Sequence, residues 1–218
     1  MKMTKAQLTK RYLLFIISLF FCAFGVAMTK RGELGVSPIS SVANVLSSIF
    51  PALSLGNWLI LWNCLLIVGQ IAVLRRDFQI VQLTQLPLSF LFGWFTDFWM
   101  WVTGFLPVPH YAVRLCMVVV GTLLLGFGIG LAVIANVVMN SGEAFVKAIS
   151  QRFNTNFGHT KIGFDIFCVV VAVLLSLVFF SGQIVGTREG TLFAALCTGL
   201  FVNAAVSRMR EPLEKLLA

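Results

Sequence analysis

The stretch Leu34-Gly-Val-Ser-Pro-Ile-Ser-Ser-Val-Ala-Asn-Val-Leu-Ser-Ser-Ile-Phe50 separates two long apolar runs and has a counterpart about one hundred residues later. The counterpart is Val138-Met-Asn-Ser-Gly-Glu-Ala-Phe-Val-Lys-Ala-Ile-Ser-Gln-Arg-Phe153, and its Ser141 stands where Ser37 stands in the first stretch. Both stretches are amphipathic and are predicted to form short helices that begin at these serines. Each helix would span only about 20 Å, against about 30 Å of hydrocarbon in a bilayer. Neither is therefore expected to cross a membrane by itself.

The composition is typical of an integral membrane protein. Of the 218 residues, 59% are hydrophobic and only 11% are charged, and the mean hydropathy is +0.95. A net charge of +8 would suggest a nucleic-acid partner in a soluble chain. Here the basic residues lie mostly at the ends of apolar runs, where they set the orientation of membrane helices. The expected surroundings are therefore a lipid bilayer, and no nucleic acid is expected as a partner.

Six apolar runs are long enough to cross a bilayer. They are Tyr12–Met28, Gly56–Leu74, Leu86–Leu106, Val113–Val138, Ile162–Phe180 and Thr191–Val206. The first run follows several basic residues, as the apolar part of a secretory signal does, but no cleavage site with small residues comes after it. It is therefore expected to remain as the first membrane helix.

The chain has the pattern of a duplicated unit. The matched positions, in unchanged order, are Gly25 with Gly128, Ser37 with Ser141, Phe50 with Phe153, Gly56 with Gly158, Asn63 with Asp165 and Gly93 with Gly199. The offsets stay between 102 and 106 residues. The two prolines of Leu106-Pro-Val-Pro-His110 cannot continue a helix. We therefore expect a first membrane repeat in residues 1–107 and a second in residues 108–218, within one membrane domain.

Each repeat holds three spans, so the second copy is expected to be inverted relative to the first. With the N-terminus in the cytoplasm, Arg75-Arg76, Lys147 and the basic C-terminal tail also fall inside, as the positive-inside bias requires. Lys30-Arg31 and Arg188 are exceptions. The predicted fold is an all-α integral membrane protein with six transmembrane helices and two short amphipathic or re-entrant helices. It is arranged as an inverted repeat of two three-span halves, and both termini are cytoplasmic.

Two placements of the short helices fit their sequences. Ser37 before Pro38 is a helix-start signal, and Ser141 with Glu143 nearby is a similar one. Either helix can lie flat in the membrane interface. Alternatively, each dips into the membrane and points its N-terminus, a positive dipole end, toward a cavity that holds an anion or a polar solute. In an inverted repeat, the two starts would then meet near the midplane and form one site with two access routes.

Polar residues inside the apolar runs are further candidates. Asp97 lies near the middle of its run, where an ionised carboxylate is costly unless it is hydrated, paired or protonated, although the tryptophans around it also fit a place at the membrane rim. Asn63 and Asp165 lie at the same depth of the two copies, as cavity-lining residues or as partners in a helix–helix hydrogen bond. Asn44 lies on the polar side of the first short helix. The predicted substrate-binding residues are Ser37, Asn44, Asn63, Asp97, Ser141, Glu143 and Asp165.

No residue pattern points to catalysis or to a metal site. The five cysteines fall singly inside predicted membrane helices, without the paired spacings of a metal site. Gly35-Val-Ser37 has no convincing catalytic histidine, because His110 and His159 are expected at the membrane interface. We therefore expect no enzymatic activity, no catalytic residue, no metal and no cofactor.

Three segments carry a resemblance to a known family. They are Gly35-Val-Ser-Pro38 after the first span, Gly56 with Asn63 in the next, and Val185-Gly-Thr-Arg-Glu-Gly-Thr-Leu-Phe-Ala-Ala-Leu-Cys-Thr-Gly199 at the start of the last. With these residues the chain resembles the bacterial YczE/YitT-type polytopic membrane proteins. It is expected on the YczE-like side, because the soluble C-terminal domain of the YitT branch is missing. The resemblance implies a bacterial inner-membrane location and a candidate transporter, and it leaves the substrate open.

The leading functional hypothesis is a small-solute transporter with its binding site between the two inverted repeats. A proton or Na⁺ could be the coupling ion, because Asp97, Glu143 and Asp165 are the carboxylates near the membrane interior or the short-helix starts. The alternatives are a substrate-binding membrane subunit of a multi-component uptake system and a non-transport membrane scaffold. The sequence does not decide whether the protein forms a homo-oligomer.

Overall fold

The computed structural model describes residues 4–108 and 110–217, and every regular element in these ranges is helical. The long helices are α1 (Lys5–Gly32), α3 (Leu55–Leu74), α4 (Gln85–Val102), α5 (Tyr111–Ala135), α7 (Phe157–Phe179) and α8 (Glu189–Leu217). The short ones are α2 (Pro38–Ile49) and α6 (Ser141–Phe153), with the 3-10 helices η1 (Arg75–Asp77) and η2 (Ile80–Thr84) between α3 and α4. The all-α prediction is confirmed.

Five helices in the described parts of the chain are long and apolar enough to cross a membrane, namely α1, α3 with η1, α5, α7 and α8. The sixth expected span, Leu86–Leu106, corresponds to α4, which begins at Gln85 and ends at Val102. Helix α4 is not among the five, and its interior carries Asp97 and three tryptophans. By length and composition, the described residues therefore form five candidate spans, whereas the sequence predicted six.

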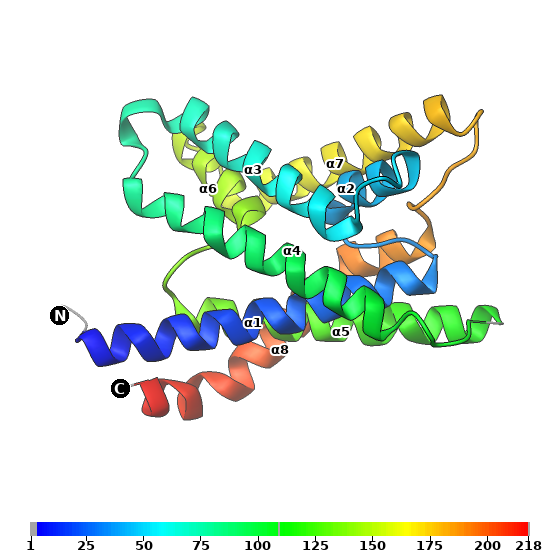
Figure 1. The fold of residues 1–218 in the computed structure, drawn as a ribbon. Coiled ribbons are helices and arrows are strands. Elements are labelled where there is room, and N and C mark those ends of the chain that lie inside the picture. Colours follow the sequence, from blue (N-terminus) through cyan, green and yellow to red (C-terminus); the bar gives the residue numbers. More distant parts are fainter. Residues whose placement is uncertain (1–3, 109, 218) are drawn as a thin grey trace.

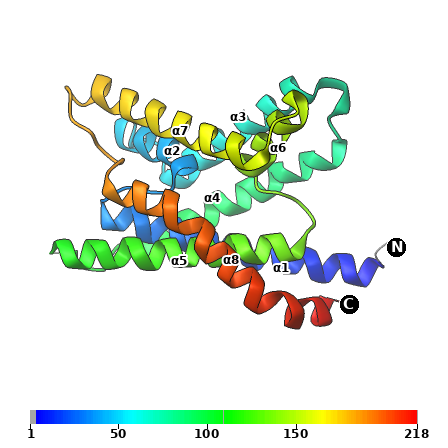
Figure 2. The same ribbon diagram turned by 180° about the vertical axis from the view of Figure 1, so that it is seen from behind.

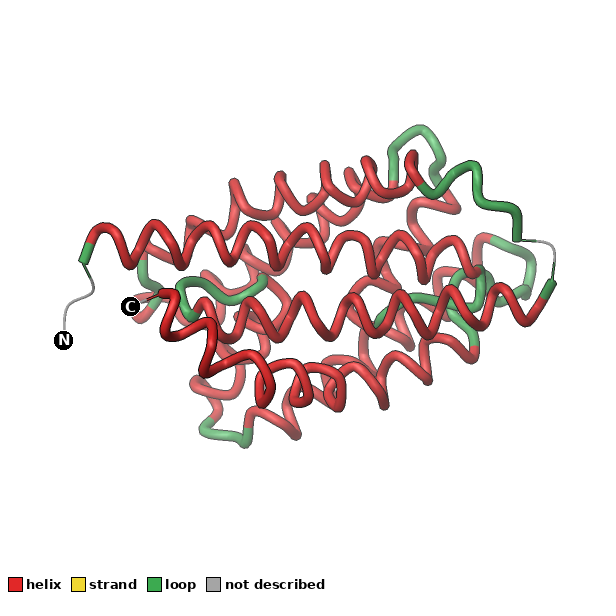
Figure 3. Tube along the Cα trace, turned by 90° about the horizontal axis from the view of Figure 1, so that it is seen from below, coloured by secondary structure: helices red, strands yellow, loops and turns green. Residues whose placement is uncertain are grey.

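The helices form two layers (Figures 1 and 2). One layer contains α1 and α5, which pack along each other, with α8 packed on α5. The other layer contains α2, α3, α6 and α7, in which α2 packs on α7 and α3 packs on α6. Helix α4 connects the layers, because it contacts both α1 and α3. Figure 3 shows the layers from below, with both termini at the same end of the molecule.

Glycines allow the closest approach of α1 and α5. A Cβ atom at Gly25 would lie 2.6 Å from the backbone nitrogen of Leu125, and one at Gly128 would lie 2.7 Å from the backbone nitrogen of Cys22. Neither position has room for a side chain, because the obstructing atoms belong to backbone that cannot rotate away. These small residues therefore let two membrane helices pack backbone to backbone.

The starts of the short helices agree with the sequence to within one residue. Helix α2 begins at Pro38 after Ser37, although the Ser37 hydroxyl bonds to the Ser40 hydroxyl at 3.1 Å instead of to a first-turn N–H. Helix α6 begins at Ser141 itself, so its N-cap residue is Asn140 and not Ser141 as predicted. Both short helices pack in the second layer, where Val45 and Val146 are fully inaccessible to solvent.

Two arginine side chains donate hydrogen bonds to carbonyl oxygens at the C-terminal ends of α5 and α4. The Arg11 guanidinium donates to the carbonyl oxygens of Ile134 and Ala135, at 3.3 and 3.1 Å, and so satisfies the end of α5. The Arg31 guanidinium donates to the Thr103 carbonyl, at 3.0 Å, directly after α4.

The connection from α3 to α4 lies at the end of the molecule that carries both termini, whereas the connection from α7 to α8 lies at the opposite end (Figure 1).

Candidate functional site

A cavity of about 780 Å³ lies between the two layers, and residues from all eight α-helices of the described chain contribute to its wall. Most of the wall is apolar. Its larger side chains include Phe15 and Leu19 of α1, Trp62 of α3, Phe92 of α4 and Ile129 of α5. This size and this character are typical of a binding site for a small molecule.

The starts of both short helices line this cavity. Residues 37–40 before and within α2 and residues 139–143 before and within α6 all contribute to the wall. The two starts are in contact, since a Cβ atom at Gly142 would lie 2.9 Å from the Cδ1 atom of Ile39. Because a helix N-terminus carries a partial positive charge, two partial positive charges face the central cavity.

Three charged side chains lie in the wall. The Lys161 ammonium binds both carboxylate oxygens of Asp165 one turn later in α7, at 2.6 and 2.5 Å. Glu143, in the first turn of α6, lines the same cavity. Burial raises the pKa of the Glu143 carboxyl, and the charge of Lys161 opposes this shift. The wall therefore contains one closed ion pair and one further carboxyl group.

A buried polar cluster holds the start of α6. The Gln70 and Gln85 side chains exchange two hydrogen bonds, and the Gln70 amide also donates to the Ser141 carbonyl at 3.2 Å. The Ser141 hydroxyl lies 3.2 Å from the Ser89 hydroxyl. All four side chains are buried, so α3 and α4 fix the position of α6 at the cavity wall.

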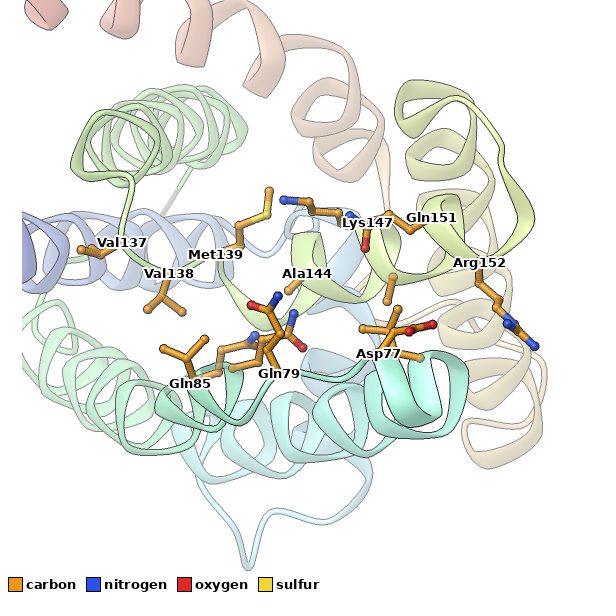
Figure 4. A pocket seen from close by; sticks show the side chains of 14 residues that line it. Asp77, Gln79, Gln85, Val137, Val138, Met139, Ala144, Lys147, Gln151 and Arg152 are labelled. Carbon is orange, nitrogen blue, oxygen red and sulfur yellow. The ribbon is translucent and has the colours of Figure 1, made fainter. Parts of the chain in front are cut away.

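A second cavity, of about 520 Å³, lies beyond this cluster. Figure 4 shows Met139 and Lys147 on one side of it and Gln79 and Gln85 on the other. The Arg152 guanidinium points away from these residues. Gln85 and Met139 line both cavities, so the glutamine pair stands between the central cavity and the second one.

The structure brings five of the seven predicted site residues together. These five, which line the central cavity, are Ser37, Asn63, Ser141, Glu143 and Asp165. The other two lie elsewhere. The Asp97 carboxylate accepts hydrogen bonds from the Gly56 backbone N–H at 2.8 Å and from the Ser54 hydroxyl at 2.5 Å, so it caps the start of α3.

Asn44 connects α2 to the segment before α8. Its side-chain amide donates to the Gly186 carbonyl at 2.8 Å, and its Oδ1 atom is buried without a hydrogen-bond partner among the described residues. The residue is 1% exposed and is not part of the cavity wall. The Asn44 side chain therefore holds α2 against the segment before α8.

Sequence reasoning missed several residues of the wall and its support. Lys161 is one of them, although its spacing of four residues from Asp165 is that of a helical ion pair. Gln70 lies in an apolar run and Gln85 at the start of one, and an amide inside such a run indicates a buried hydrogen bond. Trp62 offered no such signal, because tryptophan is common in membrane helices.

Comparisons with known proteins agree with a membrane protein. The chain is 26% identical over 200 residues to the uncharacterized membrane protein YczE of Bacillus subtilis strain 168, covering 91% of this chain and 86% of YczE. No solved structure matches the chain. The expected resemblance to YczE-type proteins is confirmed, and the apolar helices and this relative support a multi-pass membrane protein. Because the family model matches residues 9–206, the chain belongs to DUF6198, a family of unknown function.

Proposed function

We propose that this protein is a small-solute membrane transporter and that the central cavity is its binding site, placed between two inverted repeats. The observation that carries this proposal is that both short-helix starts line one cavity of about 780 Å³, together with residues from every long helix. Transporters built from inverted repeats have their substrate sites at the repeat interface, where broken helices point their N-termini at the solute.

The contact between α1 and α5 supports the repeat. Gly25 of α1 lies against Leu125 of α5, and Gly128 of α5 lies against Cys22 of α1. A shift of 103 positions converts one contact into the other, because it relates Gly25 to Gly128 and Cys22 to Leu125. This reciprocity is expected for two similar units that pack about a twofold axis.

The second layer has the same reciprocity. Helix α2 packs on α7, and their counterparts α6 and α3 pack on each other. The matched pair Val42 and Val146 and the matched pair Leu66 and Cys168 all belong to one buried cluster. The repeat proposed here therefore involves both layers and extends to the short helices.

We also propose that α4 is a sixth span and that both termini lie in the cytoplasm of a bacterial cell. The basic residues of the connection from α3 to α4, Arg75 and Arg76, then lie on the cytoplasmic side with the termini, in accordance with the positive-inside bias. In this orientation, α2 and α6 begin at the cavity and extend toward opposite membrane faces. Irregular backbone at this depth is tolerated where it lines such a cavity.

A reconstitution experiment tests the proposal. Purified protein is screened by thermal shift against a panel of metabolites, and the stabilising compounds are then offered as labelled solutes to liposomes that contain only this protein. We expect uptake by the wild-type protein and loss of uptake in Asp165→Ala, whereas Glu214→Gln, an exposed carboxylate in α8, should be unaffected. Binding without any flux would contradict transport and would favour a substrate-binding subunit that needs partner proteins.

A further inference from the structure

The charges of the central cavity indicate which solutes it takes, and this inference rests on the proposed function. Among the described lining residues, Glu143 and Asp165 carry carboxyl groups, whereas Lys161 carries the one basic side chain. Lys161 is held by both oxygens of Asp165. Glu143 is therefore the acidic group of the wall that has no side-chain counter-ion of its own.

We infer that the cavity binds an organic monocation with an apolar body, and that this cation competes with a proton for the Glu143 carboxylate. The apolar wall offers the body of the ligand a surface of aromatic and aliphatic side chains, among them Trp62 and Phe92. Aromatic faces also attract a cation directly. The N-terminus of α6 carries only about half a positive charge and so offsets only part of the charge of the Glu143 carboxylate. The remainder is costly in such surroundings unless a proton or another cation neutralises it.

The groups around Glu143 define the exchange. Lys161 and Asp165 of α7 and Cys22 of α1 line the same cavity, and with Glu143 they are the titratable residues of the described wall. When the cation enters, Glu143 releases its proton to the water on the side to which the cavity is open. When the cation leaves, Glu143 takes a proton back from that water. The net charge of the occupied and the empty cavity is then the same, which suits a cation–proton exchanger.

Two probes of equal shape and opposite charge test the inference. Tetraphenylphosphonium and tetraphenylborate are titrated onto the purified protein in detergent, and binding is measured by calorimetry. We expect the phosphonium to bind at least about tenfold more tightly than the borate, because the Glu143 carboxylate attracts the cation and repels the anion. Equal affinities, or tighter binding of the borate, would overturn the inference without any use of a variant.

Variants then identify the group. Glu143→Gln should weaken phosphonium binding by about tenfold or more, Glu143→Asp should restore most of it, and Glu214→Gln should leave it unchanged. For the wild-type protein, binding should weaken as the pH falls and should release up to about one proton per cation in weak buffer. In Glu143→Gln, both effects should vanish. Unchanged affinity or unchanged proton release in Glu143→Gln would contradict the role of Glu143.

The outcome separates this inference from the proposed function. If phosphonium binds as expected but the protein adds no cation flux to that of protein-free liposomes under a pH gradient, the cavity is a cation site and the transport proposal is wrong. If the liposomes take up a neutral or anionic solute equally well with Glu143→Gln, transport stands and the cation inference is wrong.

Discussion

Gln70 and Gln85 form a reciprocal pair in which the Nε2 atom of each donates to the Oε1 atom of the other, at 3.1 and 3.2 Å. Because Gln85 lines both cavities, we expect the pair to close the central cavity on the side of the second one. Each buried hydrogen bond contributes about 1 kcal/mol. Removing both side chains should therefore increase the fraction of protein in which the two cavities are connected by about tenfold or more.

Cys22 provides a reporter for this prediction, because it lines the central cavity and is only 2% exposed. In a protein whose other cysteines are replaced by alanine, Gln70→Ala with Gln85→Ala should speed the reaction of Cys22 with a membrane-impermeant thiol reagent. Gln79→Ala is the matched control, since Gln79 lines only the second cavity. The same reaction rate in the double variant and the control would show that the pair closes nothing.

A methyl group at Gly25 should loosen the packing of α1 on α5. A Cβ atom there meets backbone atoms of Leu125, so the helices have to separate, and overpacking of this kind costs about 1–3 kcal/mol. Gly25→Ala should lower the free energy of unfolding by this amount in a denaturing-detergent titration. Gly163→Ala is the control, because no atom lies within 4 Å of a Cβ at Gly163. Equal stability of the two variants would contradict the close approach.

Much of the fold could be predicted from the sequence, because apolar length and matched spacing are local properties. The short helices, their starts and the all-α class follow from such patterns. The depth of a polar residue in its run did not distinguish Asp97 from Asp165, however. Asp97 faces the start of α3 and Asp165 faces a cavity, and this difference depends on which helices become neighbours.

Charge asymmetry between the repeats was also hard to predict. Shifting Glu143 and Lys161 back into the first repeat leads to Ile39 and Leu59, so the charged wall residues come from the second repeat alone. The matched positions of the two repeats suggest a symmetric site, whereas the charged side chains of this cavity all belong to the second repeat. The spacing of Lys161 and Asp165 indicates their ion pair, but its place in the wall beside Glu143 depends on the packing of α7 against α6.

Asp97 should matter for stability and not for ligand binding. Its carboxylate accepts two hydrogen bonds at the start of α3, and bonds to a charged group contribute about 1.5–3 kcal/mol. Asp97→Asn retains one acceptor oxygen and should lower the free energy of unfolding by about 1–2 kcal/mol. Tetraphenylphosphonium affinity should stay within about twofold of the wild-type value. A large loss of affinity in a stably folded Asp97→Asn protein would return this residue to the binding site.

The ion pair in α7 should control the charge of Glu143. Asp165→Asn removes the counter-ion of Lys161 and leaves an ammonium group that can pair with Glu143 instead, so cation affinity should fall about tenfold or more. Lys161→Gln combined with Asp165→Asn removes both charges and should recover most of the affinity. A double variant as weak as Asp165→Asn alone would mean that Asp165 itself contacts the ligand.

The orientation of the chain can be tested at two connections that lie at opposite ends of the molecule. In a cysteine-free protein, Asp77→Cys lies between α3 and α4 and Gln183→Cys lies between α7 and α8. With a cytoplasmic N-terminus and six spans, an impermeant thiol reagent added to intact cells should label Gln183→Cys and should label Asp77→Cys only after the cells are opened. Both side chains are exposed, so a failure to react would not result from burial. Labelling of Asp77→Cys in intact cells would contradict the orientation. Labelling of both residues in intact cells would mean that an even number of spans separates them, and not the proposed three, α4, α5 and α7.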